Sequence, residues 1–145
     1  MLTLIQRVSR AEVRVDGEIV GQTGPGLLAL VGIEPGDGEA QVARMAERLF
    51  AYRVFSDDAG RMNRSLAQTG GGLLLVSQFT LAADTGSGNR PGFSTAAPPE
   101  VAERIFDRLA AVCRSLHPGV ETGRFGAHME VSLVNDGPVT FLLRA

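Results

Sequence analysis

The chain has 145 residues, of which only one is cysteine and two are histidine, and none is lysine. Cys113 alone cannot build a disulfide framework or a thiolate cluster, and its apolar helical surroundings predict a buried thiol. Two scattered histidines, His117 and His128, do not make a zinc pattern without added carboxylates. We therefore expect no metal and no cofactor.

Long apolar runs are also missing, and the N-terminal residues lack the basic and apolar regions of a signal peptide. These absences predict a cytoplasmic protein with no membrane partner. The formal net charge of −2 argues against holding nucleic acid by bulk electrostatics, and we expect no DNA partner. Arginine supplies every basic side chain, which leaves open a local bidentate grip on phosphate, although genome composition is a simpler reason for the missing lysine.

The pattern of apolar residues predicts a single domain over residues 1–145. Two helices are expected, one with Asp37 as its N-cap and one that starts at Pro98-Pro99 and ends near His117. Polar, glycine-rich segments at 56–72 and 85–97 are expected to be irregular. Runs of branched residues predict strands at 2–8, 11–16, 18–23, 27–33, 52–55, 73–76, 120–123, 130–133 and 139–143. The predicted fold class is α/β, or α+β-like, with two helices packed on a mixed, largely antiparallel sheet or open barrel.

Two short stretches stand out within this pattern. Ser77-Gln78-Phe79-Thr80 places two hydroxyls and an amide at the end of a buried strand, where backbone N–H groups can bind an oxyanion. Asn135-Asp136-Gly137-Pro138-Val139-Thr140 lies between two apolar runs, and its Gly-Pro unit presents carbonyl oxygens on a stiff backbone without side chains. Taken singly, each stretch is also compatible with an ordinary surface turn.

The sequence gives little support for other common catalytic patterns. Gly70-Gly71-Gly72 precedes a strand instead of opening a helix, so it is a poor phosphate loop, and no Rossmann or P-loop fingerprint is present. Neither histidine has a spacing that reveals a Ser/Thr-His triad. Asp57 and Asp58 are more typical of turns than of a catalytic pair.

The two stretches together resemble the signature motifs of D-aminoacyl-tRNA deacylase. The resemblance extends over nearly the whole chain, and two departures from the family pattern are Gly92 and His128, neither of which lies in a signature motif. The other segments that carry it are Ile5-Gln6-Arg7-Val8, Gly24-Pro25-Gly26-Leu27-Leu28, Gly60-Arg61-Met62-Asn63, Arg90-Pro91, Ala97-Pro98-Pro99 and Glu121-Thr122-Gly123-Arg124-Phe125-Gly126.

The resemblance implies a cytoplasmic homodimer whose active site lies at the subunit interface. A cis Gly137-Pro138 unit of one subunit would enter the pocket around residues 77–80 of the other. The implied substrate is a D-amino acid esterified to the terminal adenosine of tRNA, and the reaction is ester hydrolysis. An L-residue would push its side chain into the Gly137 and Pro138 carbonyls, while glycine has no side chain to reject.

The bond-breaking step has two versions. Either Thr80 Oγ1 is the nucleophile, or amides near Phe79 and Thr80 stabilise the oxyanion while water attacks with help from the ribose 2′-OH. We favour the second version because no base is evident beside Thr80. The predicted site residues are Ser77, Gln78, Phe79 and Thr80 for catalysis, Gly137 and Pro138 for chirality, and Arg7, Phe125, Met129, Asn135, Val139 and Thr140 in support.

The supporting residues have specific expected roles. Arg7 would brace the Gly-Pro unit by binding backbone carbonyls, although a solvated arginine at a strand edge is the simpler interpretation. Phe79, Phe125 and Met129 would line an adenine pocket, or belong to the core. Two other function classes stay open, namely a non-catalytic module that binds tRNA ends or small ligands, and a general esterase that ignores handedness.

Overall fold

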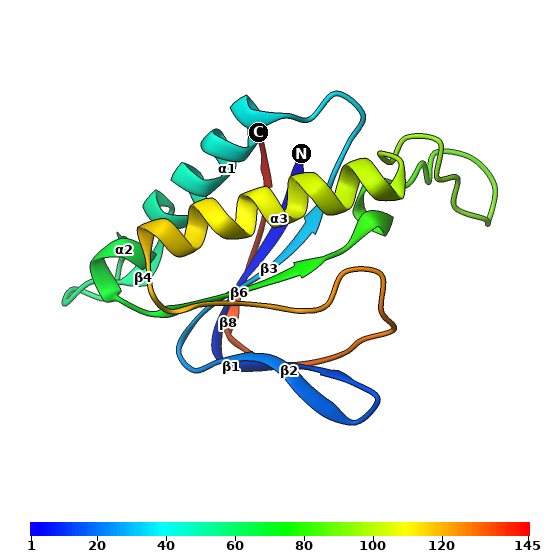
Figure 1. Cartoon of the computed structure of the whole chain (residues 1–145). Helices are drawn as coiled ribbons and strands as arrows, with labels where there is room; N and C mark the ends of the chain where they lie inside the picture. The colour runs from blue at the N-terminus through cyan, green and yellow to red at the C-terminus, as the bar shows by residue number, and fades with distance from the viewer.

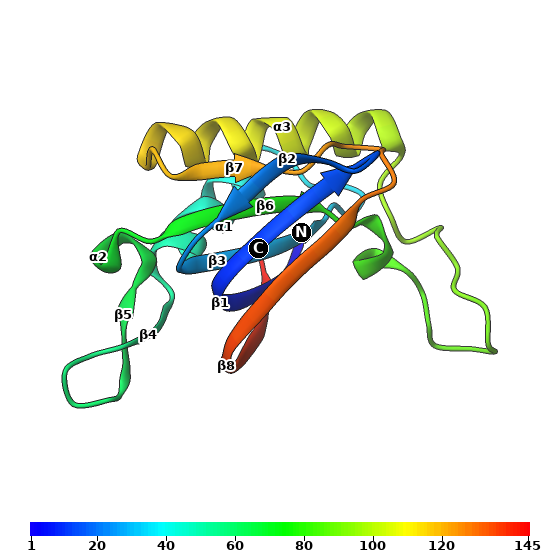
Figure 2. The same ribbon diagram turned by 90° about the horizontal axis from the view of Figure 1, so that it is seen from below.

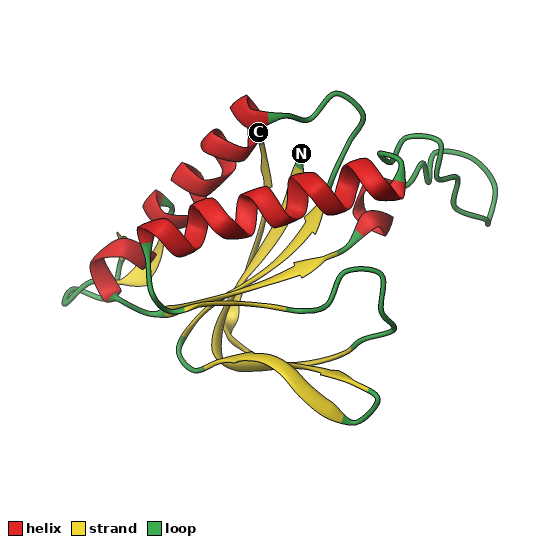
Figure 3. Ribbon diagram, viewed as in Figure 1, coloured by secondary structure: helices red, strands yellow, loops and turns green.

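A computed structural model describes residues 1–145 and has its helices packed on one face of a mixed sheet (Figures 1 and 3). Hydrogen-bonded neighbours in this sheet follow the order β2-β1-β3-β6-β7, and β8 pairs with the other edge of β1. The strands of the sheet are β1 (Leu2–Val15), β2 (Glu18–Thr23), β3 (Gly26–Gly32), β6 (Gly72–Ser77), β7 (Val120–Thr122) and β8 (Glu130–Arg144).

The sheet combines both strand directions and nearly closes on itself. β1 runs antiparallel to β2, β3 and β8, whereas β3–β6 and β6–β7 are parallel pairs. On the far side, the Gln22 backbone N–H donates to Glu121 Oε2 over 2.7 Å and links β2 to β7. The predicted mixed, largely antiparallel sheet or open barrel is therefore confirmed.

Two long helices cover the sheet as predicted, and neither could cross a membrane. Residues 56–72, expected to be irregular, instead contain most of a small hairpin and a one-turn helix. Ser65 and Gln68 form a reciprocal capping box that starts this helix, and Gly70 ends it in the left-handed conformation. The remaining elements are α1 (Glu39–Ala51), β4 (Arg53–Ser56), β5 (Met62–Ser65), α2 (Leu66–Thr69), a 3-10 helix η1 (Phe79–Ala82) and α3 (Pro99–Leu116).

The central strands β3 and β6 are buried on both faces, as their continuous apolar runs predict. Alternate residues such as Leu27 and Leu73 face the core beneath the helices, and Leu28 and Leu74 face a smaller core inside the curved sheet. Cys113 lies in the main core, where burial raises the pKa of its thiol to about 12. The predicted buried thiol is therefore confirmed, and it is protonated at neutral pH.

The segment 2–16, expected to form two strands, is one continuous strand because β1 has partners along its whole length. In the same way, β8 is one strand where two strands, 130–133 and 139–143, were expected. Opposite Arg7 the register of β8 shifts, so that Gln6 pairs with Thr140 while Val8 pairs with Asn135. The residues between Asn135 and Thr140 therefore bulge out of the ladder, and we call residues 136–139 the Gly-Pro bulge.

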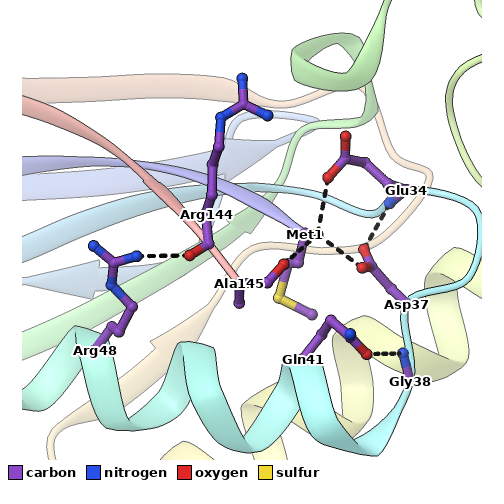
Figure 4. Close-up of polar contacts among 8 residues, drawn as sticks. All are labelled: Met1, Glu34, Asp37, Gly38, Gln41, Arg48, Arg144 and Ala145. Atoms are coloured by element: carbon purple, nitrogen blue, oxygen red, sulfur yellow. Dashed lines mark hydrogen bonds and ion pairs between the residues drawn. The ribbon is translucent and has the colours of Figure 1, made fainter.

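The prediction of Asp37 as the N-cap of α1 is wrong, because Gly38 occupies that position. Asp37 is used elsewhere: its Oδ1 accepts from the Met1 ammonium over 2.7 Å and its Oδ2 accepts from the Glu34 N–H (Figure 4). The same ammonium donates to Glu34 Oε2 and to the Ala145 carbonyl. The two chain ends thus meet beside the loop that leads into α1, an arrangement that local sequence cannot reveal.

Candidate functional site

The Ser77-Gln78-Phe79-Thr80 stretch lies where β6 gives way to η1. Ser77 is the last residue of β6 and pairs with Val31, and the Gln78 N–H donates to the Val31 carbonyl over 2.7 Å. η1 begins at Phe79, so the N–H groups of Phe79 and Thr80 open a helix and have no acceptor within it. Two adjacent amide donors therefore sit at the end of a rigid, buried strand, which is an arrangement suited to a developing oxyanion.

Side chains that could activate Thr80 as a nucleophile do not contact it. Its Oγ1 accepts a hydrogen bond from Gln78 Nε2, and neither histidine nor any carboxylate bonds to it. His117 bonds to the Gly71 carbonyl before the start of β6, roughly 20 Å along the strand from Ser77. His128 is exposed. The geometry therefore agrees with the version in which backbone amides, rather than a Thr-His pair, act on the substrate.

A mostly apolar cavity of about 240 Å³ opens beside Ser77. Phe125 forms part of its wall and packs against Phe106, with ring centroids 6.2 Å apart. Phe79 contributes as well, is 55% exposed, and packs with a tilted ring against Phe93 from the loop before α3, with ring centroids 5.1 Å apart. The lining residues are Val31, Ile33, Ser77, Phe79, Ala97, Pro99, Ala102, Phe106, Phe125 and Gly126. Such a cavity suits a flat, weakly polar group that belongs to a larger molecule, with the reactive end of that molecule at Ser77.

Met129 does not line this cavity. Its side chain packs against the smaller core on the other face of the sheet, with Val13 and Val76 among the residues of that core. In the isolated chain Met129 therefore has the core role that the sequence left open as an alternative.

The Gly-Pro bulge is held in place by side chains on both of its flanks. Arg7 Nε donates to the Asp136 carbonyl over 2.9 Å, which is the type of contact expected for this residue. Asn135 Oδ1 accepts from the Val139 N–H, and Asn135 Nδ2 donates to Thr140 Oγ1, both over 2.9 Å. The Gly137–Pro138 peptide bond is cis.

The two motifs do not meet within one chain. Across the sheet, Ser77 is level with Thr3 of β1, whereas the bulge is level with Arg7 and lies beyond β1 on β8. Four residues along a strand and three strand spacings correspond to roughly 20 Å. A single site that uses both motifs therefore needs a second copy of the chain.

β8 offers a surface for such a copy. It is the outermost strand beside β1, so its outer backbone edge has no partner in the monomer (Figure 2). Long unpaired edges invite pairing with another chain. Several large apolar side chains on this strand are exposed, namely Val131, Val134, Phe141 and Leu142.

Comparison with known proteins gives evidence on the family of this chain that is independent of its geometry. The family model described as D-Tyr-tRNA(Tyr) deacylase matches residues 4–144. The chain belongs to this family. Among its relatives, proteins named D-aminoacyl-tRNA deacylase from Xanthomonas axonopodis pv. citri (strain 306) and Stenotrophomonas maltophilia (strain K279a) are 78% and 77% identical. Both alignments cover 99% of each chain, and the family predicted from the two motifs is confirmed.

Solved structures share the fold of this chain. One, named c-Myc DNA Unwinding Element Binding Protein, has a TM-score of 0.95 and 36% identity, over 100% of this chain and 99% of its own. Another, described as a probable eukaryotic D-amino acid tRNA deacylase, has a TM-score of 0.86 over 99% and 98% of the two chains. At 14% identity the second shows the fold alone.

Sequence reasoning missed one contact at the site of this deacylase family member. Arg7 NH1 donates to the Val54 carbonyl over 2.7 Å, so the same side chain joins the Gly-Pro bulge to β4. Positions 7, 54 and 136 are far apart in the chain, and no local pattern signals their contact. Groups of three or more metal-binding side chains were not found either.

Proposed function

We propose that this chain hydrolyses the ester bond of D-aminoacyl-tRNA and releases the free D-amino acid and tRNA. The observation that carries the proposal is the pair of opening amides at Phe79 and Thr80, beside an apolar cavity, in a chain that belongs to the deacylase family. Aminoacylated tRNA is used in the cytoplasm, where we expect the protein to act.

The ester carbonyl is positioned by the Phe79 and Thr80 amides. Water, assisted by the ribose 2′-OH, adds to the carbonyl carbon, and the negative charge that develops on the oxygen is held by these N–H groups. The bond to the ribose 3′-oxygen then breaks, and that oxygen takes up a proton. Where one such donor has been removed in other enzymes, the rate fell by about 10²–10³.

The terminal adenine occupies the cavity beside Ser77. Phe125 and Phe106 supply an apolar wall on which a base can pack, and aromatic side chains are common partners of unstacked bases. Phe79 stands at the same cavity and next to the amides, so base and ester are held by neighbouring residues. The adenine is common to all tRNA ends, which agrees with an enzyme that accepts many amino acids.

Handedness is read by the Gly-Pro bulge of a second subunit. Asp136, Gly137 and Pro138 of the bulge are exposed, lie roughly 20 Å from the amides of their own chain, and adjoin the unpaired edge of β8. Inserted into the partner's site, the Gly137 and Pro138 carbonyls form a backbone wall at the α-carbon. An L-side chain clashes with this wall and a D-side chain points away, so the direction of the substituent matters and its identity does not.

Hydrolysis of three matched substrates tests the proposal. We expect rapid multiple turnover of D-tyrosyl-tRNA, measurable turnover of glycyl-tRNA, and rejection of L-tyrosyl-tRNA by at least about 10³-fold in kcat/KM. Equal hydrolysis of D- and L-tyrosyl-tRNA would indicate a general esterase. Untouched glycyl-tRNA beside cleaved D-tyrosyl-tRNA would mean that something other than a backbone wall rejects L-residues.

Substitution of Thr80 separates the two versions of the chemical step. Thr80→Ala removes the hydroxyl and its bond to Gln78 but leaves both amides in place, so we expect kcat/KM to fall by less than about tenfold. Thr80→Ser retains a hydroxyl and is the matched control. Loss of activity to the uncatalysed level in the alanine variant, with retention in the serine variant, would instead make Thr80 the nucleophile.

A non-catalytic nucleic-acid-binding module is the second candidate, favoured by the 36% identical structure, which is named as a DNA-binding protein. The number of amino acids released per site distinguishes this candidate from an enzyme. A binding module protects at most one ester per site, whereas an enzyme releases many amino acids per site. Competition by unrelated duplex DNA in the same assay tests the expectation that DNA is not a partner.

A further inference from the structure

The β4–β5 hairpin is joined to the Gly-Pro bulge through the half-buried side chain of Arg7. Arg7, whose side chain is 13% exposed, donates to the Val54 carbonyl with NH1 and to the Asp136 carbonyl with Nε. These bonds measure 2.7 and 2.9 Å. The base of the hairpin therefore stays next to the Gly-Pro bulge, whichever site the bulge enters.

The hairpin turn is built around one carboxylate. Asp57 accepts from the backbone N–H groups of Ala59 and Arg61 and from Asn63 Nδ2. The hydrogen bond from the Arg61 N–H is the largest of the effects that lower the pKa of Asp57. The Asp57 carboxylate therefore holds the turn together, and its charge also acts on Arg64.

Three arginines of the hairpin are exposed to solvent. Arg61 forms no side-chain hydrogen bond or ion pair, and Arg53 bonds only to the Asn63 amide oxygen. Arg64 pairs with Asp58, whose side chain is 94% exposed. Exposed pairs of this kind contribute little to stability, so Arg64 can exchange Asp58 for another anion.

The hairpin also has the reach to extend a site. It projects away from the sheet on the side where β8 is exposed (Figure 2). From Val54 to Asp57, where the turn begins, the extended chain covers roughly 10 Å, a length over which one strand of a stacked duplex carries about three phosphates. Arginine binds phosphate with a planar, bidentate geometry.

We infer that the β4–β5 hairpin binds the acceptor-strand phosphates of the tRNA whose 3′ end occupies the partner subunit's site. The inference rests on the proposed function, because the bulge beside the hairpin must enter that site. Arg61 and Arg64 are the principal contacts. Each site then receives two parts from the neighbouring chain, a backbone wall that reads handedness and a basic arm that holds the tRNA.

The test compares a full tRNA with a minimal substrate. For the Arg61→Ala/Arg64→Ala double variant we expect kcat/KM on D-tyrosyl-tRNA to fall about tenfold, and the slope of log kcat/KM against log salt to decrease by about two. On 3′-O-(D-tyrosyl)adenosine, which has no phosphate backbone, the same variant is expected to match the wild type within about twofold.

The matched control is Arg44→Ala/Arg104→Ala, on the two long helices. Arg44 also pairs with an exposed carboxylate, and Arg104 also has no side-chain partner. This control is expected to leave both substrates and the salt slope unchanged. An equal loss in the control, or an equal loss on both substrates in the hairpin variant, overturns the inference. Failure of the wild type on both substrates overturns the proposed function, and the inference with it.

Mixed dimers test which chain supplies the arm. One subunit carries Gly137→Ala, which damages the bulge, and the other carries the Arg61→Ala/Arg64→Ala pair. If the bulge and the hairpin of one chain serve the same site, the only site with an intact bulge lacks the two hairpin arginines. The rate of tRNA hydrolysis, divided by the number of intact bulges, then stays about tenfold below that of the wild type. Half of the wild-type activity would place the hairpin at the site of its own chain and overturn the inference.

Discussion

Gly137→Ala is expected to lower kcat/KM on D-aminoacyl-tRNA by at least about 100-fold while leaving the fold intact. A Cβ at this position would lie 2.5 Å from the Val139 backbone nitrogen and 2.7 Å from Val139 Cγ2. Val139 is buried in the main core and cannot move far, so the Gly137 backbone must shift. A displacement of about 1 Å in a positioned catalytic group can reduce the rate by about 10².

The readouts are steady-state hydrolysis of D- and L-tyrosyl-tRNA and a thermal melt. Gly24→Ala is the matched control, because its added Cβ would meet no atom within 4 Å. We expect the control to behave as wild type and the Gly137 variant to lose D-activity without a matching loss of thermal stability. A Gly137→Ala protein with normal rate and normal D/L ratio would exclude the bulge from the site.

Asp37→Asn is expected to have the largest effect on stability among single polar substitutions at the chain ends. Asp37 is 6% exposed and its carboxylate pairs with the fully buried Met1 ammonium. Removing one partner of a buried ion pair usually costs about 3–5 kcal/mol, and because Glu34 still pairs with the ammonium we expect about 2–3 kcal/mol here. For a chain of this size, that loss corresponds to a decrease in Tm of about 10 °C.

Glu34→Gln provides the comparison for this prediction. Glu34 contacts the same ammonium but is 36% exposed, so its loss should change the free energy of unfolding by less than about 1 kcal/mol. Chemical denaturation of both variants gives the two values directly. Equal, small effects of the two substitutions would mean that water solvates the ammonium and that Asp37 has no special structural role.

Local patterns predicted much of the fold because each long element repeats a simple period. The apolar stripes of α1 and α3 and the continuous runs of β3 and β6 are signals of burial that hold in any context. One error falls where a polar residue was assigned a local role. Asp37 is a good N-cap by type, yet its carboxylate instead pairs with the Met1 ammonium, which is distant in the sequence but adjacent in the fold.

The candidate site likewise has a part that local sequence patterns predicted and a part that they did not. Ser77–Thr80 could be located from the sequence because a buried strand that ends in polar residues is a local pattern. The cavity beside it, with walls from Ile33, Ala97 and Phe106, could not, since these residues meet only after α3 has packed on the sheet. The contact of Arg7 with Val54 was likewise hidden by its separation along the chain.

By itself, the sequence determined the family, the strand and helix periods, and the two motifs that carry the proposed chemistry, because these depend on residue type and spacing alone. Only the tertiary structure decided that the Gly-Pro segment is a bulge inside one long strand, that it is distant from the amides of its own chain, and that a basic hairpin is tied to it. The reason is physical: register, burial and ion pairing depend on which distant segments come together, and those contacts exist only in the folded chain.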